Sequence, residues 1–353
     1  MPSSLASFSP PLPAVSLAVA RARAVALTRA LATARGRAFS LPVARTLAVA
    51  RILAVALAPL AGSLVGLFVS PHGAGAQEGL KVYISADMEG VVGVVTGDHL
   101  GPTGFEYQEA REWLTGEVNA AIRAARAAGA TEIVVSDSHG NGENILLDEI
   151  PRGVRLVRSW PRPLAMMQGI DETFDAALYI GYHASTTNSK GVRAHTMSSG
   201  TLTAVKLNGV PVSEAVINAA IAGHFGVPIV MISGDDAIVA EAQEALGDLE
   251  GAVLKWNYGF HSAMTVTPEE GQEIIAEKVS AALRRLDDYQ PYRLDGPIQV
   301  EVSFKNYLAA ELLTYLPIVD RVDSHTISFT GADMVEVSKF FSFITSYRPD
   351  ITP

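Results

Sequence analysis

Three apolar runs of this chain end in side chains of the kind that bind metal ions. The first run ends in Asp87 and Glu89, the second in Asp137 and His139, and the third in His183. Such runs are typical of strands buried in a parallel sheet, and the carboxyl ends of parallel strands meet at one edge. Asp87 and Glu89 are two residues apart, so both side chains leave the same face of an extended backbone, about 6–7 Å apart. The sequence therefore predicts a metal site at one edge of a sheet.

Strand-like and helix-like segments alternate from residue 77 onward. Apolar residues recur at helical spacing over residues 105–128, and Ser213 is a suitable N-cap for a second helix over residues 214–223. The Asn208-Gly209 pair predicts the turn of a hairpin. The alternation predicts an α/β fold, with a largely parallel sheet that carries helices on both faces.

The pattern changes near residue 262. Beyond it we expect helices over residues 268–286, 308–316 and 332–345 and strands over residues 298–304 and 326–329. None of these strands ends in His. We therefore predict residues 77–261 as a metal-binding catalytic α/β domain and residues 262–353 as a smaller C-terminal β/α subdomain for packing or assembly.

The first 76 residues have the features of an export leader. Residues 1–77 contain seven Arg but no Asp, Glu or Lys, residues 52–69 are largely apolar, and Ala74-Gly75-Ala76 is a small-x-small cleavage pattern. We predict cleavage near Ala76 and export to the periplasm or the medium. Three alternatives stay open: a membrane anchor through the uncleaved leader, an organelle transit peptide, or a cytoplasmic protein whose first residues reflect an upstream start codon.

The charge and cysteine content restrict the partners and ligands. Of the 27 Lys and Arg, seven lie in the leader, which leaves 20 against all 37 acidic residues and a formal net charge of −17. A domain this acidic is a poor candidate for binding nucleic acid. The chain has no Cys, so a metal site must use nitrogen and oxygen ligands.

Each candidate ligand also has a structural interpretation. Asp137 would orient a loop, and a single His is more often hydrogen-bonded than metal-bound. Glu214 lies in a first helical turn, where the helix dipole already favours an acid. His195 lies in a Gly- and Ser-rich loop, where a buried structural role is less natural. Asp235 and Asp236 end another apolar run and compete for any metal.

The motifs together resemble the zinc-dependent D-aminopeptidases of the DppA type, peptidase family M55. The resemblance spans residues 80–347 and depends on six blocks in order: Ser85-Ala86-Asp87-Met88-Glu89-Gly90, Ser136-Asp137-Ser138-His139, Gly181-Tyr182-His183-Ala184, Ala194-His195-Thr196-Met197, Val212-Ser213-Glu214 and Ser233-Gly234-Asp235-Asp236. Each block alone is weak, but the ordered set is specific. The family is usually cytosolic without a leader, and this chain departs from it there.

The resemblance implies two zinc ions per subunit, with Mn²⁺ or Co²⁺ as substitutes. Asp87 would be shared by both ions, Glu89, His139, His183 and Glu214 would complete the ligands, and His195 would be catalytic. It also implies a metal-bearing domain, a smaller second domain and a homo-oligomeric ring, a decamer in the family.

The resulting hypothesis is an aminopeptidase that releases N-terminal D-Ala or Gly from short peptides through a metal-activated water. Two alternatives remain. A dinuclear phosphoesterase uses similar ligands but needs basic residues beside the metals, where the sequence offers Lys190, Arg193 and Lys206. The second alternative is an exported protein that binds a metal or a peptide without turnover.

Overall fold

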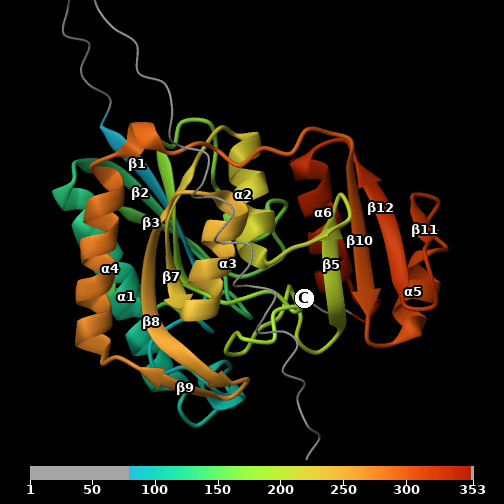
Figure 1. Cartoon of the computed structure of the whole chain (residues 1–353), viewed down its shortest axis with the longest axis horizontal. Helices are drawn as coiled ribbons and strands as arrows, with labels where there is room; N and C mark the ends of the chain where they lie inside the picture. Colours follow the sequence, from blue (N-terminus) through green and yellow to red (C-terminus); the bar gives the residue numbers. More distant parts are fainter. Residues whose placement is uncertain (1–78, 351–353) are drawn as a thin grey trace, which may run out of the picture. The chain divides into compact units, whose positions relative to one another are not determined.

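The fold is built around a seven-stranded sheet (Figure 1). The computed structural model describes residues 79–350, so the predicted leader lies outside the described residues. The strand order is β3-β2-β1-β4-β7-β8-β9, and all neighbours are parallel except β8 and β9. The strands are β1 (Leu80–Ala86), β2 (Ala130–Asp137), β3 (Val154–Val157), β4 (Ala176–Tyr182), β7 (Ile229–Asp235), β8 (Glu250–Gly259) and β9 (Ser262–Thr265).

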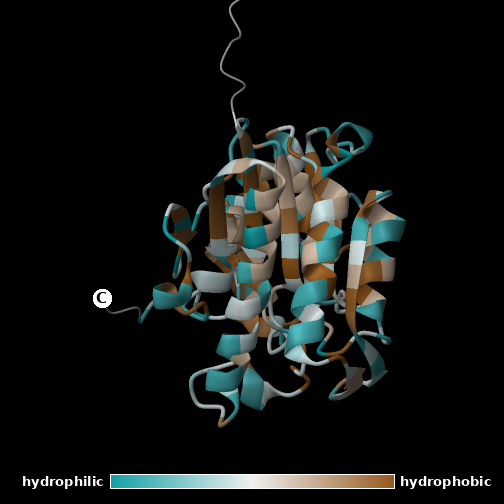
Figure 2. Cartoon of the chain, turned by 90° about the vertical axis from the view of Figure 1, so that its left-hand side faces the viewer, coloured by the Kyte–Doolittle hydropathy of each residue, from teal (hydrophilic) through white to brown (hydrophobic). Residues whose placement is uncertain are grey.

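Helices cover both faces of this sheet. Helices α1 (Tyr107–Ala127) and α4 (Pro268–Leu283) pack together on one face, and α2 (Glu214–His224) and α3 (Asp236–Leu246) lie on the other (Figure 1). Hydrophobic residues concentrate in the strands and hydrophilic residues on the outer helices and loops (Figure 2). Strand β4 is buried at every residue because it lies at the centre and is covered on both sides. The predicted α/β class is confirmed.

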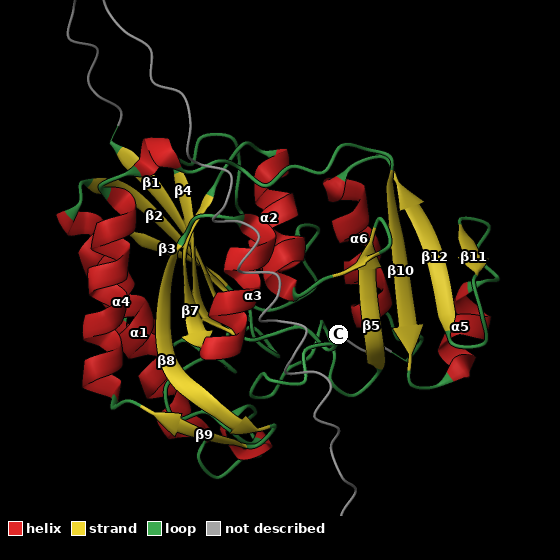
Figure 3. Cartoon of the chain, in the orientation of Figure 1, coloured by secondary structure: helices red, strands yellow, loops and turns green. Residues whose placement is uncertain are grey.

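A second, five-stranded sheet is antiparallel throughout (Figure 3). Its order is β11-β12-β10-β5-β6, and helices α5 (Tyr307–Leu313) and α6 (Met334–Ser346) accompany it. The strands are β5 (Leu202–Leu207), β6 (Val210–Pro211), β10 (Ile298–Phe304), β11 (Val319–Arg321) and β12 (Thr326–Gly331). Asn208 and Gly209 have φ values of 50° and 81°, so the predicted hairpin turn joins β5 and β6.

The second sheet does not begin at residue 262. It takes β5 and β6 from within residues 77–261, whereas β9 and α4, which follow residue 261, pack with the first sheet. A chain that leaves one sheet and returns to it has no sharp boundary in its sequence. Strands β3, β8, β9 and β11 and helix α3 were not expected from the apolar pattern. Among residues 79–350, no helix combines the length and apolar content needed to cross a membrane.

Candidate metal centre

Five acidic and imidazole side chains meet at the carboxyl edge of the seven-stranded sheet. Asp87 and Glu89 follow β1, His139 follows β2, His183 follows β4, and Glu214 is the first residue of α2. All five are buried. The strand order reverses between β1 and β4, and in α/β sheets this switch point is where ligands bind.

The first group consists of Asp87, Glu89 and His139. The Nδ1 atom of His139 lies 2.9 Å from Oε2 of Glu89 and 3.2 Å from Oδ1 of Asp87. Each residue offers a ligand atom, and the three atoms lie within 4.8 Å of one another. This spacing suits one metal ion bound by two oxygens and a nitrogen.

The second group consists of Asp87, His183 and Glu214. The Nε2 atom of His183 lies 3.4 Å from Oδ2 of Asp87 and 3.4 Å from Oε1 of Glu214. Asp87 thus directs Oδ1 toward His139 and Oδ2 toward His183. One carboxylate is shared by two groups of ligands, as a bridging ligand of a metal pair would be.

His195 lies between the two groups. Its Nε2 atom is 3.9 Å from Oε1 of Glu89 and 3.8 Å from Oε1 of Glu214, and its ring stacks on that of His183 with centroids 4.0 Å apart. Glu89, His183 and His195 also form a group that could hold an ion. The position of His195 therefore fits either a ligand or a side chain that acts beside the metals.

Backbone carbonyl groups orient all three imidazoles. His139 Nε2 is 2.9 Å from the oxygen of Leu100, His183 Nδ1 is 3.1 Å from that of Ala184, and His195 Nδ1 is 2.9 Å from that of Arg193. A carbonyl only accepts, so each of these nitrogens carries the proton. The other nitrogen of each ring faces the carboxylates and can bind a metal ion once it has lost its proton.

The electrostatics of the cluster favour positive charge. Burial raises the pKa of Glu89 and Glu214, but the neighbouring His139 and His183 outweigh burial and hold both pKa values below the usual range. Burial lowers the pKa of these two imidazoles, but Glu89, Glu214 and Asp87 outweigh it and raise both pKa values well above the usual range.

Three buried polar atoms of the cluster have no hydrogen-bond partner among the described residues: Oδ2 of Asp87, Oε2 of Glu89 and Nε2 of His183. Leaving buried polar groups unpaired is costly, and an ion that binds them removes the cost. Neutral imidazole and carboxylate are ligands that suit zinc and similar divalent metals. The side chains present therefore fit a pair of divalent cations.

Comparisons with known proteins identify the family. The sequence profile of the D-aminopeptidases, peptidase family M55, matches residues 80–343. A D-aminopeptidase of Bacillus subtilis (strain 168) is 30% identical over 258 residues, which cover 73% of this chain and 93% of that protein. The chain belongs to peptidase family M55.

The fold agrees with a solved structure of the same family. The structure described as "Zn-dependent D-aminopeptidase DppA from Bacillus subtilis, a self-compartmentalizing protease" superimposes with a TM-score of 0.71 at 29% identity. The superposition covers 76% of this chain and 100% of the solved chain. This M55 peptidase is therefore a hydrolase that acts on peptide bonds.

The remaining acids of the M55 motifs have structural contacts. Asp137 accepts from the backbone N–H groups of Asn144 and Ile145, and so holds the loop after β2. Asp235 caps α3 by accepting from the N–H of Ile238 and also accepts from Val192, and Asp236 accepts from Asn257. Among residues 79–350, none of these three acids joins a group that could hold a metal. They are not competitors for the ion.

Two buried charged residues behind the site were missed from the sequence. Lys255 of β8 is fully buried and donates to the carbonyl oxygens of Glu89, Val91 and Val94 at 2.5, 2.9 and 2.5 Å. Glu117 of α1 is also fully buried and accepts from the N–H of Val92 at 2.9 Å. Burial raises the pKa of Glu117 to about 8 and lowers that of Lys255 to about 8. The sequence did contain a signal for this pair, because Lys255 interrupts an otherwise apolar run.

A cavity of about 690 Å³ opens above the cluster of ligands. Its lining combines residues at the carboxyl edge of the seven-stranded sheet with residues of α6, the helix that accompanies the second sheet. The lining includes the apolar side chains Leu100, Trp160, Pro161, Met166 and Met197, several hydroxyl groups and two arginines. The size and mixed polarity suit a small polar ligand.

Proposed function

We propose that this M55 peptidase is a dinuclear-zinc aminopeptidase that releases N-terminal D-residues from short peptides. The observation that carries the proposal is the shared carboxylate of Asp87 between two buried groups of ligands. The names of the two relatives support zinc and the D-specificity.

The five buried residues would divide between two ions. Asp87 would contact both, Glu89 and His139 would complete one set, and His183 and Glu214 the other. When bound, the pair would lower the pKa of a water molecule and polarise the carbonyl of the peptide bond. Mn²⁺ or Co²⁺ would be acceptable substitutes, because they take the same nitrogen and oxygen ligands.

His195 would transfer a proton to the leaving amine. The carbonyl of Arg193 holds the proton on Nδ1, so Nε2 is the nitrogen that exchanges a proton with the substrate. The side chain keeps 12% of its surface exposed and lines the cavity, so it can reach a bound peptide. A ligand role would instead require that removing His195 also removes metal.

The substrates we propose are D-Ala and Gly at the amino end of short peptides, including D-Ala-D-Ala. A free amine would lie near the carboxylates, and the cavity of about 690 Å³ has room for only a few residues. The test is the purified protein loaded with zinc, offered D-Ala-D-Ala, L-Ala-L-Ala and N-acetyl-D-Ala-D-Ala. We expect cleavage of the first alone.

The outcomes of this assay separate the alternatives. Preference for the L-dipeptide would leave an aminopeptidase but reject D-specificity, and cleavage of the blocked peptide would reject the aminopeptidase. Hydrolysis of nitrophenyl phosphate without any peptide cleavage would indicate a phosphoesterase. Bound metal with no hydrolysis of any substrate would indicate a binding protein.

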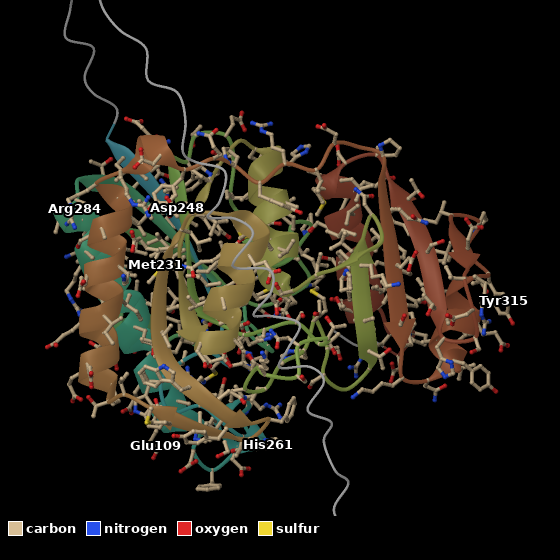
Figure 4. All side chains as sticks on the ribbon, in the orientation of Figure 1. Glu109, Met231, Asp248, His261, Arg284 and Tyr315 are labelled. Carbon is tan, nitrogen blue, oxygen red and sulfur yellow. The ribbon has the colours of Figure 1, made fainter. Side chains whose placement is uncertain are left out.

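We further propose that the protein forms a homo-oligomeric ring. The solved relative is described as self-compartmentalizing. Two separate groups of exposed apolar side chains support an assembly: one around α5 and the residues after it, including Leu312, Tyr315 and Ile318, and one on β8 and β9, including Tyr258 and Met264 (Figure 4 labels Tyr315). Contact between two different surfaces generates a closed ring when the rotation between neighbouring subunits closes on itself. Mass photometry should show more than one subunit, and Leu312→Asp should reduce the size. A monomeric wild type would contradict the proposal.

The export hypothesis is a separate proposal that depends on the first 76 residues. N-terminal sequencing of the native protein should give a start close to Gln77. An intact leader on protein from the soluble cytosol would contradict it.

A further inference from the structure

Two arginines line the cavity that contains the metal ligands. Arg193 lies in the loop between β4 and β5, and Arg348 follows α6, so they come from distant parts of the chain. They are the only Lys or Arg side chains among the lining residues. Neither forms an ion pair with an acid of the described part of the chain. Two cationic groups therefore face the cavity without an acidic partner of their own.

Arg193 is the more constrained of the two. Its guanidinium lies over the ring of Phe260, 5.2 Å from the centroid, and its buried Nε has no hydrogen-bond partner within residues 79–350. Stacking on an aromatic ring holds a guanidinium in place and leaves its edge N–H groups available. The acids of the cavity do not use these groups, because Asp87, Glu89 and Glu214 face imidazoles instead.

We propose that Arg193 and Arg348 form a binding subsite for the C-terminal carboxylate of a short peptide. The proposal rests on the proposed aminopeptidase function, because a dipeptide bound by its amine near the metal ligands still carries a free carboxylate. Guanidinium groups match carboxylates in geometry and charge. The subsite restricts the substrates to very short peptides with an unmodified carboxyl end.

The first test compares D-Ala-D-Ala with its C-terminal amide on the zinc-loaded wild type. A charge-assisted hydrogen bond lost on amidation should lower kcat/KM about 10-fold or more. Equal kcat/KM for the two peptides would overturn the subsite and leave the aminopeptidase intact. Absence of cleavage of both would reject the proposed function itself.

The second test uses Arg193→Gln and Arg348→Gln. Both variants should raise KM for the acid but not for the amide, so that the preference for the acid falls toward one. Arg284→Gln is the matched control, because Arg284 is exposed at the end of α4 (labelled in Figure 4) and does not line the cavity. The preference of this variant should stay at its wild-type value. Equal losses on acid and amide in both cavity variants would show that the arginines only support the wall, and would overturn the subsite.

Two buried charged side chains bind the backbone of the segment that holds Glu89. The ammonium group of Lys255 joins three carbonyl oxygens of residues 89–94, and Glu117 binds the N–H of Val92 in the same segment. Both charged side chains are fully buried. A buried ammonium group is retained at a cost unless its donors are satisfied, and here three carbonyl groups satisfy them.

We infer that Lys255 is a positioning residue, which holds Glu89 in place for one of the two metal ions. Removing the ammonium group would release three carbonyls at once and let Glu89 move. His183 and Glu214 lie on other segments, and among the described residues neither is hydrogen-bonded to the Lys255 ammonium group. One metal site should therefore weaken and the other should not.

The test is Lys255→Met, which keeps the length of the side chain without its charge. Competition with a chelator should show that one of the two zinc ions binds at least about 10-fold more weakly than in the wild type. Removing a group that positions a metal ligand typically lowers metal affinity by this much. Lys278→Met, at a partly exposed ion pair with Glu250, should leave both ions unchanged. Equal weakening of both ions, or of neither, would overturn the inference.

A measurement on the wild type covers the case in which Lys255→Met does not fold. Hydrogen exchange of residues 89–94 after chelation should be as slow as that of β1, because the contacts of Lys255 and Glu117 do not depend on metal. Fast exchange of this segment would overturn the inference.

Discussion

The two sheets contribute unequally to the candidate metal centre. In the seven-stranded sheet the parallel strands β1, β2 and β4 end at one edge, and the segments that follow them carry four of the five proposed ligands. In the antiparallel sheet successive strands end at opposite edges, and no residue of it joins a metal-capable group among residues 79–350. Yet α6, beside that sheet, lines the cavity. Parallel strands thus concentrate chemical groups, while the second sheet shapes the space around them.

The largest effect expected from this division is the loss of metal. Chelation should lower activity by about 10⁴-fold or more, since metal and activated water supply several kcal/mol of transition-state stabilisation. His139→Ala and His183→Ala should lower both zinc content and rate, whereas His325→Ala, an exposed histidine beside the second sheet, should change neither. Elemental analysis and kinetics are the measurements, and activity that survives a strong chelator would contradict the metal site.

His195→Ala should have the next largest effect. We expect kcat to fall by about 10²–10⁴-fold, the range for a lost general acid, with zinc content and Tm near the wild-type values. His224→Ala, at the exposed end of α2, is the matched control and should keep its rate. Loss of zinc from the His195 variant would make His195 a ligand.

The benefit of zinc should grow with pH. The raised pKa values of His139 and His183 in the metal-free protein stabilise it below their ordinary value of 6.5, and this stabilisation is lost as the pH rises through the raised values. Zinc requires neutral imidazoles, so its affinity should rise up to about tenfold per pH unit for each proton released. The increase in Tm on adding zinc should therefore be larger at pH 8 than at pH 6, and an equal or smaller increase would contradict this electrostatic account.

A change in the core of the second sheet should affect stability and not metal binding. Val302 of β10 is fully buried, so Val302→Ala should lower the free energy of unfolding by about 2 kcal/mol, from lost burial and the cavity left behind. Denaturant titration measures the first effect and chelator competition the second. Weaker zinc binding by the Val302 variant would mean that the packing of the second sheet affects the metal ligands on the first.

The smallest effect is expected at the surface of the same sheet. Lys206 pairs with Glu301 at 3.1 Å, but 37% of the Lys206 side chain is exposed. Lys206→Met should change the free energy of unfolding by less than about 1 kcal/mol and leave kcat/KM unchanged. A large loss of activity would show that this basic residue, considered from the sequence as a neighbour of the metals, acts on the site after all.

The sequence by itself determined the fold class and placed four of the five clustered residues, Asp87, Glu89, His139 and His183, after apolar runs. Apolar runs that end in Asp, Glu and His carry both pieces of information locally, because burial and side-chain alternation depend on adjacent residues. The sequence also predicted that Asp137 could orient a loop, and its contacts with Asn144 and Ile145 show that it does.

Only the tertiary structure decided which groups surround those residues. Lys255 reaches Glu89 across 166 positions of the chain, and Arg348 reaches the cavity from the end of α6. The carbonyl of Leu100 orients His139 from a loop whose pattern has no special feature. Contacts between distant segments depend on how the sheets pack, and the local spacing of residues does not encode them.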